Sequence, residues 1–562
     1  MAYDGSTQRK SLAHDRACKW EKRGDALFLV QGVHCTFWQT QAEIFYPERA
    51  DFTTIQAEGA DRYAGIYTSI PQTMRRDLAN NLGSMLRPRG EDWFKAVVRP
   101  GKLMKQENVR AWCEHVTERQ REIMYAPNAG FARAMAESDN DYATIGNAIV
   151  ALTDNHDRSG LLFTCIHPRD CAWAENAEGV IDELHRKITM TLVQLARLFG
   201  ETKLPREWQQ RLKDHPHDKK TIRQCVAPID LFEYGPGEHP HPKFRFASIY
   251  YIPGEKEPFL GEGFFTAFPF LVRRWTTVSG EAYGRSPCAS VALADASSLN
   301  AAEMSLLKAI EWTVDPPKMV RDEVVLGEVR LEAGGLTAVA HDYDGRNGKA
   351  VENFDVGDPK WGVEYVRERN HRMGLIWFQN VLKLPDRELT AYEARERLKM
   401  LVREASPIIE PMEADNARLC DTTYEKCDEH NAFDPAPDEI INSEVTYEFE
   451  TPLTAARKEL KAANVMAKTA NFTAMREVWP DVVDIADSDE MGRDMMSDVP
   501  ASYLRKPEEI EQMRAERAAQ RAEREKAALA MEMGKTVMAA RPENLKMAEQ
   551  QLGSEAQAGG MV

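Results

Sequence analysis

The stretch RRWTTVSGEAYGRSPCASVALADASSLN (residues 273–300) leads into the segment that decides the fold. From Ser298 onward, apolar residues recur at spacings of three and four, which predicts a helix with one apolar face made of Leu299, Ala302, Leu306 and Ile310. The sequence Asp315-Pro316-Pro317 ends this helix, because proline has no N–H to donate and clashes with the preceding turn.

A β-rich insert and a second helix follow. Residues 329–332 alternate in polarity and Gly334-Gly335 comes next, which predicts a hairpin whose return strand is residues 336–340. Asp358-Pro359 then supplies an N-cap and a first-turn proline for a helix over residues 360–378, about 30 Å long. Two helices of similar size are therefore expected to flank a small β module.

A third helix is expected after the loop at residues 380–390. Thr390 and Glu393 form a capping-box signal for its start, and apolar residues then recur at three- and four-residue steps as far as Met412. Pro407 and Pro411 are expected to kink this helix.

The rest of the chain reads as mixed helix and strand. Residues 180–199 are expected to form an amphipathic helix that ends at Gly200, and the stretches 243–253 and 445–450 alternate as strands do. Residues 506–533 are rich in Glu, Arg and Ala, which predicts a charged helix that is either solvated or buried only against other copies. We expect the last ten residues to be disordered.

Composition limits the possible functions. A chain of 562 residues needs more than one hydrophobic core, and the absence of a long apolar run or an apolar signal sequence favours a soluble protein that is not secreted. Nine cysteines without a CxxC pair argue against a disulfide framework or a zinc ribbon, which favours a reducing compartment. The net charge of −17 would repel DNA over most of the surface, so a DNA role would be loose passage.

No pattern assigns catalytic residues, a metal or a cofactor. Two histidine pairs could be imagined as metal ligands, but no HExxH helix or cysteine set accompanies them, and surface turns set by prolines are the favoured interpretation: His215, His217, His239 and His241. Residues 345–350 lack the spacing of a phosphate loop, and the acidic run 484–490 is read as a solvated face. The chain is therefore not expected to be an enzyme.

Positive charge is concentrated on the second helix and in the loop after it. The residues concerned are Arg367, Arg369, His371, Arg372, Lys383 and Arg387. These side chains could pair with Glu364 and Glu368 at the surface, or could meet phosphates if the helix lines a pore. Both interpretations stay open.

The stretch 273–300 resembles the signature of the podovirus-type head-to-tail connector (portal) family, which has an Arg, then G-E-x-Y-G-R-S-P, then the start of a long helix. The matching residues are Arg274, Gly280, Glu281, Tyr283, Gly284, Arg285, Ser286 and Pro287. Other stretches agree with the family in order, and they lie at residues 79–94, 146–153, 175–186 and 446–458. The resemblance covers most of residues 79–460.

The resemblance implies an α+β, multi-part portal fold that assembles into a dodecameric ring. Its implied parts are an α/β wing (1–283), a first stem helix (284–313), a small β-containing clip (314–357), a second stem helix (358–380), a tunnel loop with a long kinked helix (381–432), a return to the wing (433–500), and a C-terminal crown or barrel helix with a disordered tail (501–562).

The resemblance also implies a function. A portal protein forms the ring at the capsid vertex through which viral double-stranded DNA is packaged and ejected, and it docks terminase, capsid or scaffolding and tail adaptor proteins. Such a protein is expected in the virion and, during assembly, in the host cytoplasm, without membrane contact. Lys383, Arg387, Arg367, Arg369 and Arg372 would be the DNA-channel cations. The alternatives are a metal-dependent hydrolase and a ring or scaffold protein without a DNA channel.

Overall fold

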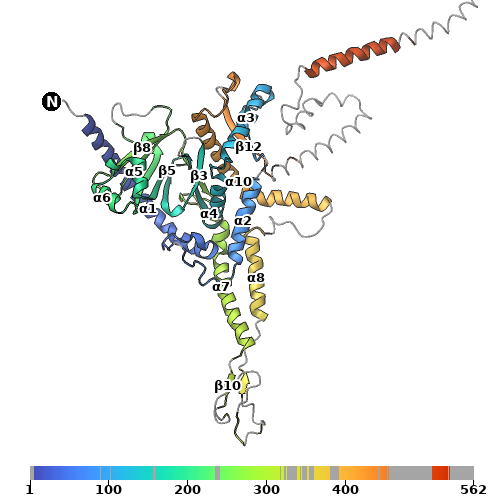
Figure 1. Cartoon of the computed structure of the whole chain (residues 1–562). Helices are drawn as coiled ribbons and strands as arrows, with labels where there is room; N and C mark the ends of the chain where they lie inside the picture. The colour runs from blue at the N-terminus through green and yellow to red at the C-terminus, as the bar shows by residue number, and fades with distance from the viewer. Residues whose placement is uncertain are drawn as a thin grey trace, which may run out of the picture. The chain divides into compact units, whose positions relative to one another are not determined.

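The computed structural model describes most of the chain (Figure 1). The described residues are 5–57, 59–88, 90, 92–101, 103–155, 160–234, 241–316, 318–321, 325, 338–341, 344, 351–353, 360–379, 391–440, 443–451, 454, 458, 509–528 and 531. One compact unit comprises residues 1–103 and 112–465, and a second comprises residues 104–111 and 466–562. None of the helices in the described ranges is long and apolar enough to cross a membrane.

Antiparallel sheets form the body of the first unit. A five-stranded sheet has the order β4-β5-β6-β7-β8, a three-stranded sheet has the order β3-β2-β9, and β1 pairs with β12. The strands are β1 (Phe94–Arg99), β2 (Asn147–Asp154), β3 (Leu161–Ile166), β4 (Cys171–Glu175), β5 (Ile181–Thr191), β6 (Lys219–Pro228), β7 (Phe246–Tyr251), β8 (Phe259–Phe265), β9 (Phe270–Arg274) and β12 (Glu444–Phe449). Strands β7 and β12 confirm the two strands expected from alternating sequence.

The helix expected over residues 180–199 is only half correct. Residues 181–191 form strand β5, and the helix is limited to α5 (Leu192–Phe199), which the side chain of Thr191 caps and Gly200 ends. Because β5 is hydrogen-bonded to β4 on one edge and to β6 on the other, sheet pairing overrides the helical spacing of its apolar residues.

A long N-terminal helix, α1 (Gly5–Phe45), packs against the sheets, and no sequence pattern predicted it. Its buried side contributes to three hydrophobic clusters, through side chains that include Trp20, Trp38 and Phe45. The other helices of the body are α2 (Ile70–Leu86), α4 (Phe131–Ile145) and α6 (Arg206–Asp214), together with residues 112–124 of α3 (Glu107–Met124). Short 3-10 helices lie at Pro47–Arg49, Leu103–Lys105, Pro168–Asp170, Glu201–Lys203, Ile229–Leu231 and Asp438–Ile440.

Two helices extend from the body: α7 (Pro287–Val314) and α8 (Lys360–Ile376). They run antiparallel and side by side (Figure 1), and Gly362 of α8 approaches Leu306 of α7 closely. Helix α7 begins well before Ser298, where the apolar pattern starts. Between the two helices, β10 (Lys318–Val320) pairs antiparallel with β11 (Val351–Asn353), as expected for a β insert. The Gly334-Gly335 turn lies outside the described residues.

One hydrophobic cluster joins the body to the base of this helix pair. It includes Phe45 of α1, Leu78 and Leu82 of α2, Leu299 of α7, and Trp377 just after α8. Each of these side chains is at most 1% exposed. The base of the helix pair is therefore anchored in the same core as α1 and α2.

Helix α10 (Ala391–Glu429) follows, and it begins where the capping-box signal predicted. Figure 1 shows this helix in two runs that differ in direction, as expected for a helix that contains Pro407 and Pro411. In the second unit, residues 509–528 are helical and almost entirely exposed, in agreement with the charged helix predicted there.

Candidate functional site

The signature at residues 274–287 forms a joint between the body and helix α7. Thr276 and Arg285 pair as an antiparallel bridge, which brings Gly284 against Gly146 at the start of β2. A Cβ on Gly146 would lie 2.1 Å from the carbonyl carbon of Arg285, and a Cβ on Gly284 would lie 2.8 Å from the carbonyl oxygen of Gly146. Glycine is required at both positions because two backbone segments meet there.

The side chain of Asn147 holds the two backbone segments together. Its side-chain amide donates to the carbonyl oxygen of Gly284 (2.7 Å), and its side-chain oxygen accepts from the backbone N–H of Gly284 (2.7 Å). Asn147 is fully buried, so these two bonds satisfy an amide that would otherwise be costly to bury. The two hydrogen bonds follow the pattern of one hydrogen-bonded residue pair in an antiparallel sheet.

Ser286 caps two helices at once. Its hydroxyl accepts from the N–H of Ala289 in the first turn of α7 (3.1 Å) and donates to the carbonyl oxygen of Ala143 in the last turn of α4 (2.6 Å). Both backbone groups belong to helix ends that lack partners within their own helices. Pro287 follows at the first helical position, where its missing N–H costs nothing.

The remaining signature residues make further contacts around the joint. Tyr283 is buried among aromatic rings, with ring-centroid distances of 4.3 Å to Trp173 and 4.6 Å to His34. Arg274 pairs with Glu175 and donates to the carbonyl oxygen of Gly179 (3.0 Å). The other contacts are the Glu281–Arg285 ion pair (2.8 Å) and the left-handed backbone of Gly280 (φ 91°).

A buried ionic cluster lies behind the joint. Asp139 of α4 binds both Arg273 of β9, at 2.7 Å, and Arg87 after α2. The guanidinium of Arg273 also lies 3.7 Å from Asp415 of α10. Burial raises the pKa of Asp415 to about 6, although Arg273 acts to lower it. The cluster joins α4, β9, α10 and the residue after α2 through charged side chains that are buried from solvent.

The three predicted cations of α8 have different surroundings. Arg367 and Arg372 are exposed, as the pore interpretation requires. Arg369 is half-buried: it pairs with Asp295 of α7 and lies over the ring of Tyr365, 5.1 Å from its centroid. Arg369 therefore fastens α8 to α7. Lys383 and Arg387 lie outside the described residues.

Some of the residues considered for enzyme chemistry lie in the described part of the chain. No group of three or more His, Cys, Asp or Glu residues that could hold a metal occurs there, and His215 and His217 lie at the turn after α6. Residues 345–350 and 484–490 lie outside the described ranges. Burial raises the pKa of the Cys165 thiol, which disfavours the reactive thiolate.

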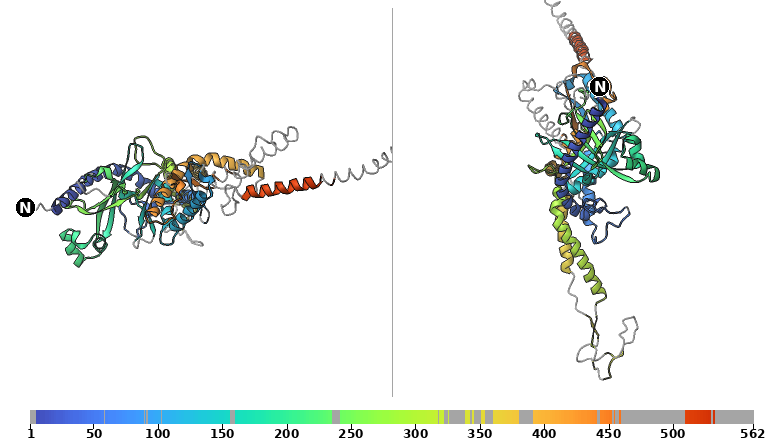
Figure 2. Two further views of the ribbon diagram at one scale, coloured as in Figure 1. Left: turned by 90° about the horizontal axis from the view of Figure 1, so that it is seen from above. Right: turned by 90° about the vertical axis from the view of Figure 1, so that its left-hand side faces the viewer.

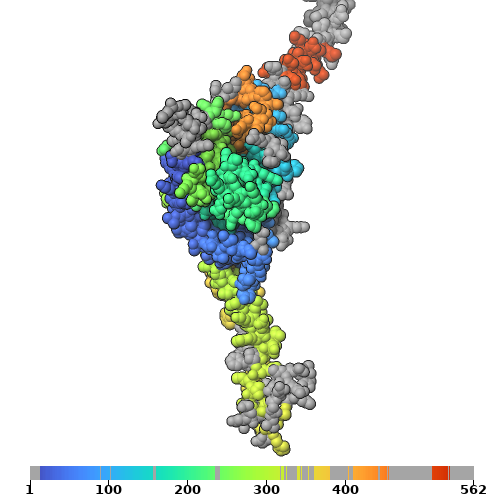
Figure 3. Space-filling model, turned by 60° about the vertical axis from the view of Figure 1, so that its left-hand side comes forward, coloured from blue at the N-terminus to red at the C-terminus, as the bar shows by residue number. Residues whose placement is uncertain are grey.

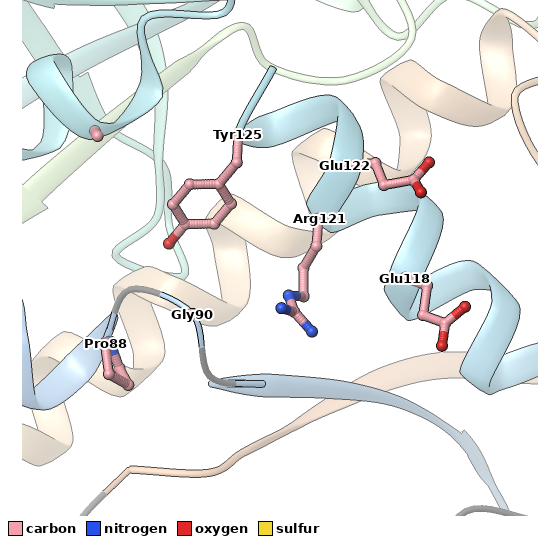
Figure 4. Close-up of a pocket in the computed structure, with 7 residues that line it drawn as sticks. Pro88, Gly90, Glu118, Arg121, Glu122 and Tyr125 are labelled. Carbon is pink, nitrogen blue, oxygen red and sulfur yellow. The ribbon is translucent and has the colours of Figure 1, made fainter. Parts of the chain in front are cut away.

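An open cavity of about 590 Å³ lies beside α3. Figure 4 shows Glu118, Arg121 and Glu122 of this helix, and Tyr125 directly after its end, along the wall of the cavity. Arg121 is already paired with Asp92, and the hydroxyl of Tyr125 accepts from the indole N–H of Trp93 (3.0 Å). These polar groups therefore make contacts within the chain that stabilise the wall of the cavity.

The fold and the joint thus define a mixed helix-and-sheet protein with a helix pair that extends from its body. A model of the family described as "Bacteriophage head to tail connecting protein" matches residues 32–502. The chain belongs to this family, whose members are structural proteins and not enzymes. Podovirus type, which the signature suggested, stays a prediction.

Individual proteins are also similar to this chain. The chain is 23% identical over 464 residues to "Probable portal protein" of Bordetella phage BPP-1, which covers 80% of this chain and 82% of the relative. Two similar solved structures are the virion of a native gene transfer agent particle (TM-score 0.32, 10% identity, 72% of this chain and 87% of that chain) and the neck of that particle computed with C12 symmetry (0.32, 11%, 72% and 88%). The portal function predicted from the signature is confirmed by the family.

The sequence signature identified the residues of the joint but not the residues that contact them. Gly146 and Asn147 stand in the stretch 146–153 that agreed with the family in order, but nothing in the sequence alone placed them against Gly284. Ser138 and Asp139, which both bind Arg273, carried no sequence signal either.

Proposed function

We propose that this portal protein closes into a ring, of twelve copies as the resemblance implies, with α7 and α8 forming the wall of an axial channel. The observation that carries this proposal is the set of large apolar side chains that the helix pair leaves exposed. They are Val291, Leu307, Ile310, Trp312, Val314, Trp361 and Val363, each at least 43% exposed. Two helices packed only on each other cannot cover these side chains, whereas neighbouring copies in a ring could.

The proposed cargo is viral double-stranded DNA, in packaging and in ejection. A net charge of −17 per copy would keep DNA solvated, since repulsion acts over a Debye length of about 10 Å at 0.1 M salt. Exposed Arg367 and Arg372 would touch phosphates transiently, together with Lys383 and Arg387 of the loop. Arg369 would contribute least, because Asp295 balances its charge.

The same proposal covers the finer parts of the assembly. Residues 314–357, with their paired strands β10 and β11, would be the clip that docks terminase and tail adaptor proteins. Residues 501–562 would form the crown or barrel, and capsid or scaffolding proteins would contact the wing. The particle would hold the ring at its vertex, after assembly in the host cytoplasm, and a separate ATPase would supply the energy of translocation.

The double variant Arg367→Glu/Arg372→Glu tests the channel. Both side chains are exposed, so we expect the variant to fold and form rings as wild type does, and to package less DNA per particle. Arg133→Glu, at an 86% exposed side chain of α4, is the matched control for charge reversal. Encapsidated DNA is measured after nuclease treatment. Packaging equal to that of the control would exclude DNA contact by α8.

A further inference from the structure

Helix α1 has an apolar face that no part of the described chain covers. Its exposed residues lie at i, i+1, i+4 and i+8, which places them on one side of the helix: Leu29 (78% exposed), Val30 (54%), Val33 (74%) and Phe37 (37%). We call these four residues the α1 apolar face. The opposite side of the same segment is buried against the sheets through Cys35, Trp38 and Ala42.

The helix segment that carries this face has no charged residue of its own. Residues 26–42 contain no Asp, Glu, Lys or Arg, although 29% of the chain is charged. His34 is half-buried, and burial lowers its pKa, which keeps the ring neutral near pH 7. Depletion of charged residues is what distinguishes the core of a protein interface from ordinary surface.

The end of the helix that carries this face contacts the first turn of α7. Gln41, one turn beyond Phe37, donates to the hydroxyl of Ser290 at the start of α7 (3.1 Å). The next residue of α7, Val291, is 64% exposed. Figure 2 shows α1 running down the body toward α7, and Figure 3 shows α1 (blue) at the surface of the body above the helix pair. The helix that carries the α1 apolar face is thus joined to the start of α7, which also exposes an apolar side chain.

We propose that the α1 apolar face is covered by the adjacent copy of this chain in the ring. The proposal rests on ring formation as proposed above, and it adds a second zone of contact, on the body, to the contact along the stem. Every copy carries a net charge of −17, so a contact between copies requires surfaces that do not add like charges at the point of contact. The α1 apolar face meets that requirement. A ring contact joins two different faces, so α1 would meet a surface of its neighbour other than α1.

Thiol labelling of the assembled protein tests this directly. The native cysteines give low background, since seven are buried and Cys18 and Cys165 are half-buried. In purified rings, Val33→Cys should lose labelling by a maleimide that it shows before assembly, whereas Asn128→Cys, in the exposed turn between α3 and α4, should keep it. Equal labelling of both thiols in closed rings would overturn the proposal.

A charge placed on the face gives a second readout. Val33→Glu should keep the melting temperature of unassembled wild type, because Val33 is exposed, but should shift the protein from rings to single subunits at concentrations where wild type is assembled. Asn128→Glu adds the same charge elsewhere and should assemble normally. Rings formed equally by both variants would contradict the role of α1. Failure of wild type itself to form rings would instead overturn the proposed function.

Discussion

The hydroxyl of Ser286 joins the body to the stem, and Ser286→Ala removes it with little change of volume. The substitution deprives the Ala289 N–H of its cap and the Ala143 carbonyl of its donor, in a position that water does not reach because Ser286 is fully buried. Loss of an N-cap costs about 0.5–2 kcal/mol. Loss of a buried hydrogen bond adds about 0.5–1.5 kcal/mol, so we expect a total of about 1–3.5 kcal/mol.

Ser297→Ala is the control on the same helix. The hydroxyl of Ser297 is exposed and bonds only to the carbonyl oxygen of Leu293 one turn earlier, so its removal should change stability by less than about 0.5 kcal/mol. Both variants are compared with wild type by urea unfolding at one protein concentration, since assembly would add stability by mass action. Hydrogen exchange of the peptide around Ala289 reports the local effect.

If Ser286 caps α7 as described, the two variants differ in stability and in hydrogen exchange. Ser286→Ala should unfold at lower urea and exchange faster in the first turn of α7, and Ser297→Ala should match wild type. Coinciding unfolding curves and exchange rates for the two variants would show that Ser286 does not cap α7, and would refute the reasoning from the joint.

Two further predictions concern the same region. Gly146→Ala should cost more than about 3 kcal/mol, because its Cβ would meet the backbone of Arg285, whereas Gly179→Ala, also at φ 76° but in open space, should cost about 1 kcal/mol; equal melting temperatures would contradict this. The pKa of Asp415 is about 6 in the folded state and about 4 in the unfolded state. Protonated Asp415 therefore stabilises the fold by up to about 3 kcal/mol below pH 4. This stabilisation is lost as the pH rises through 6. Relative to wild type, Asp415→Asn should therefore gain stability between pH 4 and pH 7, and parallel melting-temperature profiles for the two proteins would contradict the raised pKa.

The stem could be predicted from the sequence because its signals are local. Asp358-Pro359 and Asp315-Pro316-Pro317 mark helix ends that depend on backbone chemistry alone, and the structure places the end of α7 and the start of α8 there. The start of α7 was set too late by the apolar pattern, because the first turns of the helix are buried through small residues such as Ala289 and Ala292. Only the signature resemblance located that start.

Helix α1 and strand β5 could not be predicted for opposite reasons. Helix α1 buries Gly24 and Gln31 and exposes Leu29 and Val33, so the usual contrast between an apolar and a polar side is missing. Strand β5 shows a helical spacing that its two neighbouring strands override. The charged cluster around Arg273 depends on four elements distant in sequence, and no local pattern reports such a meeting.

The central claim is that copies of this chain enclose a hollow axis, with α7 and α8 as its wall. Native mass measurement together with class-averaged electron micrographs of the purified full-length protein tests it most directly. The account predicts closed rings with an axial opening wide enough for duplex DNA. A single subunit that stays monomeric under near-physiological conditions, or a ring whose centre is filled, would contradict it.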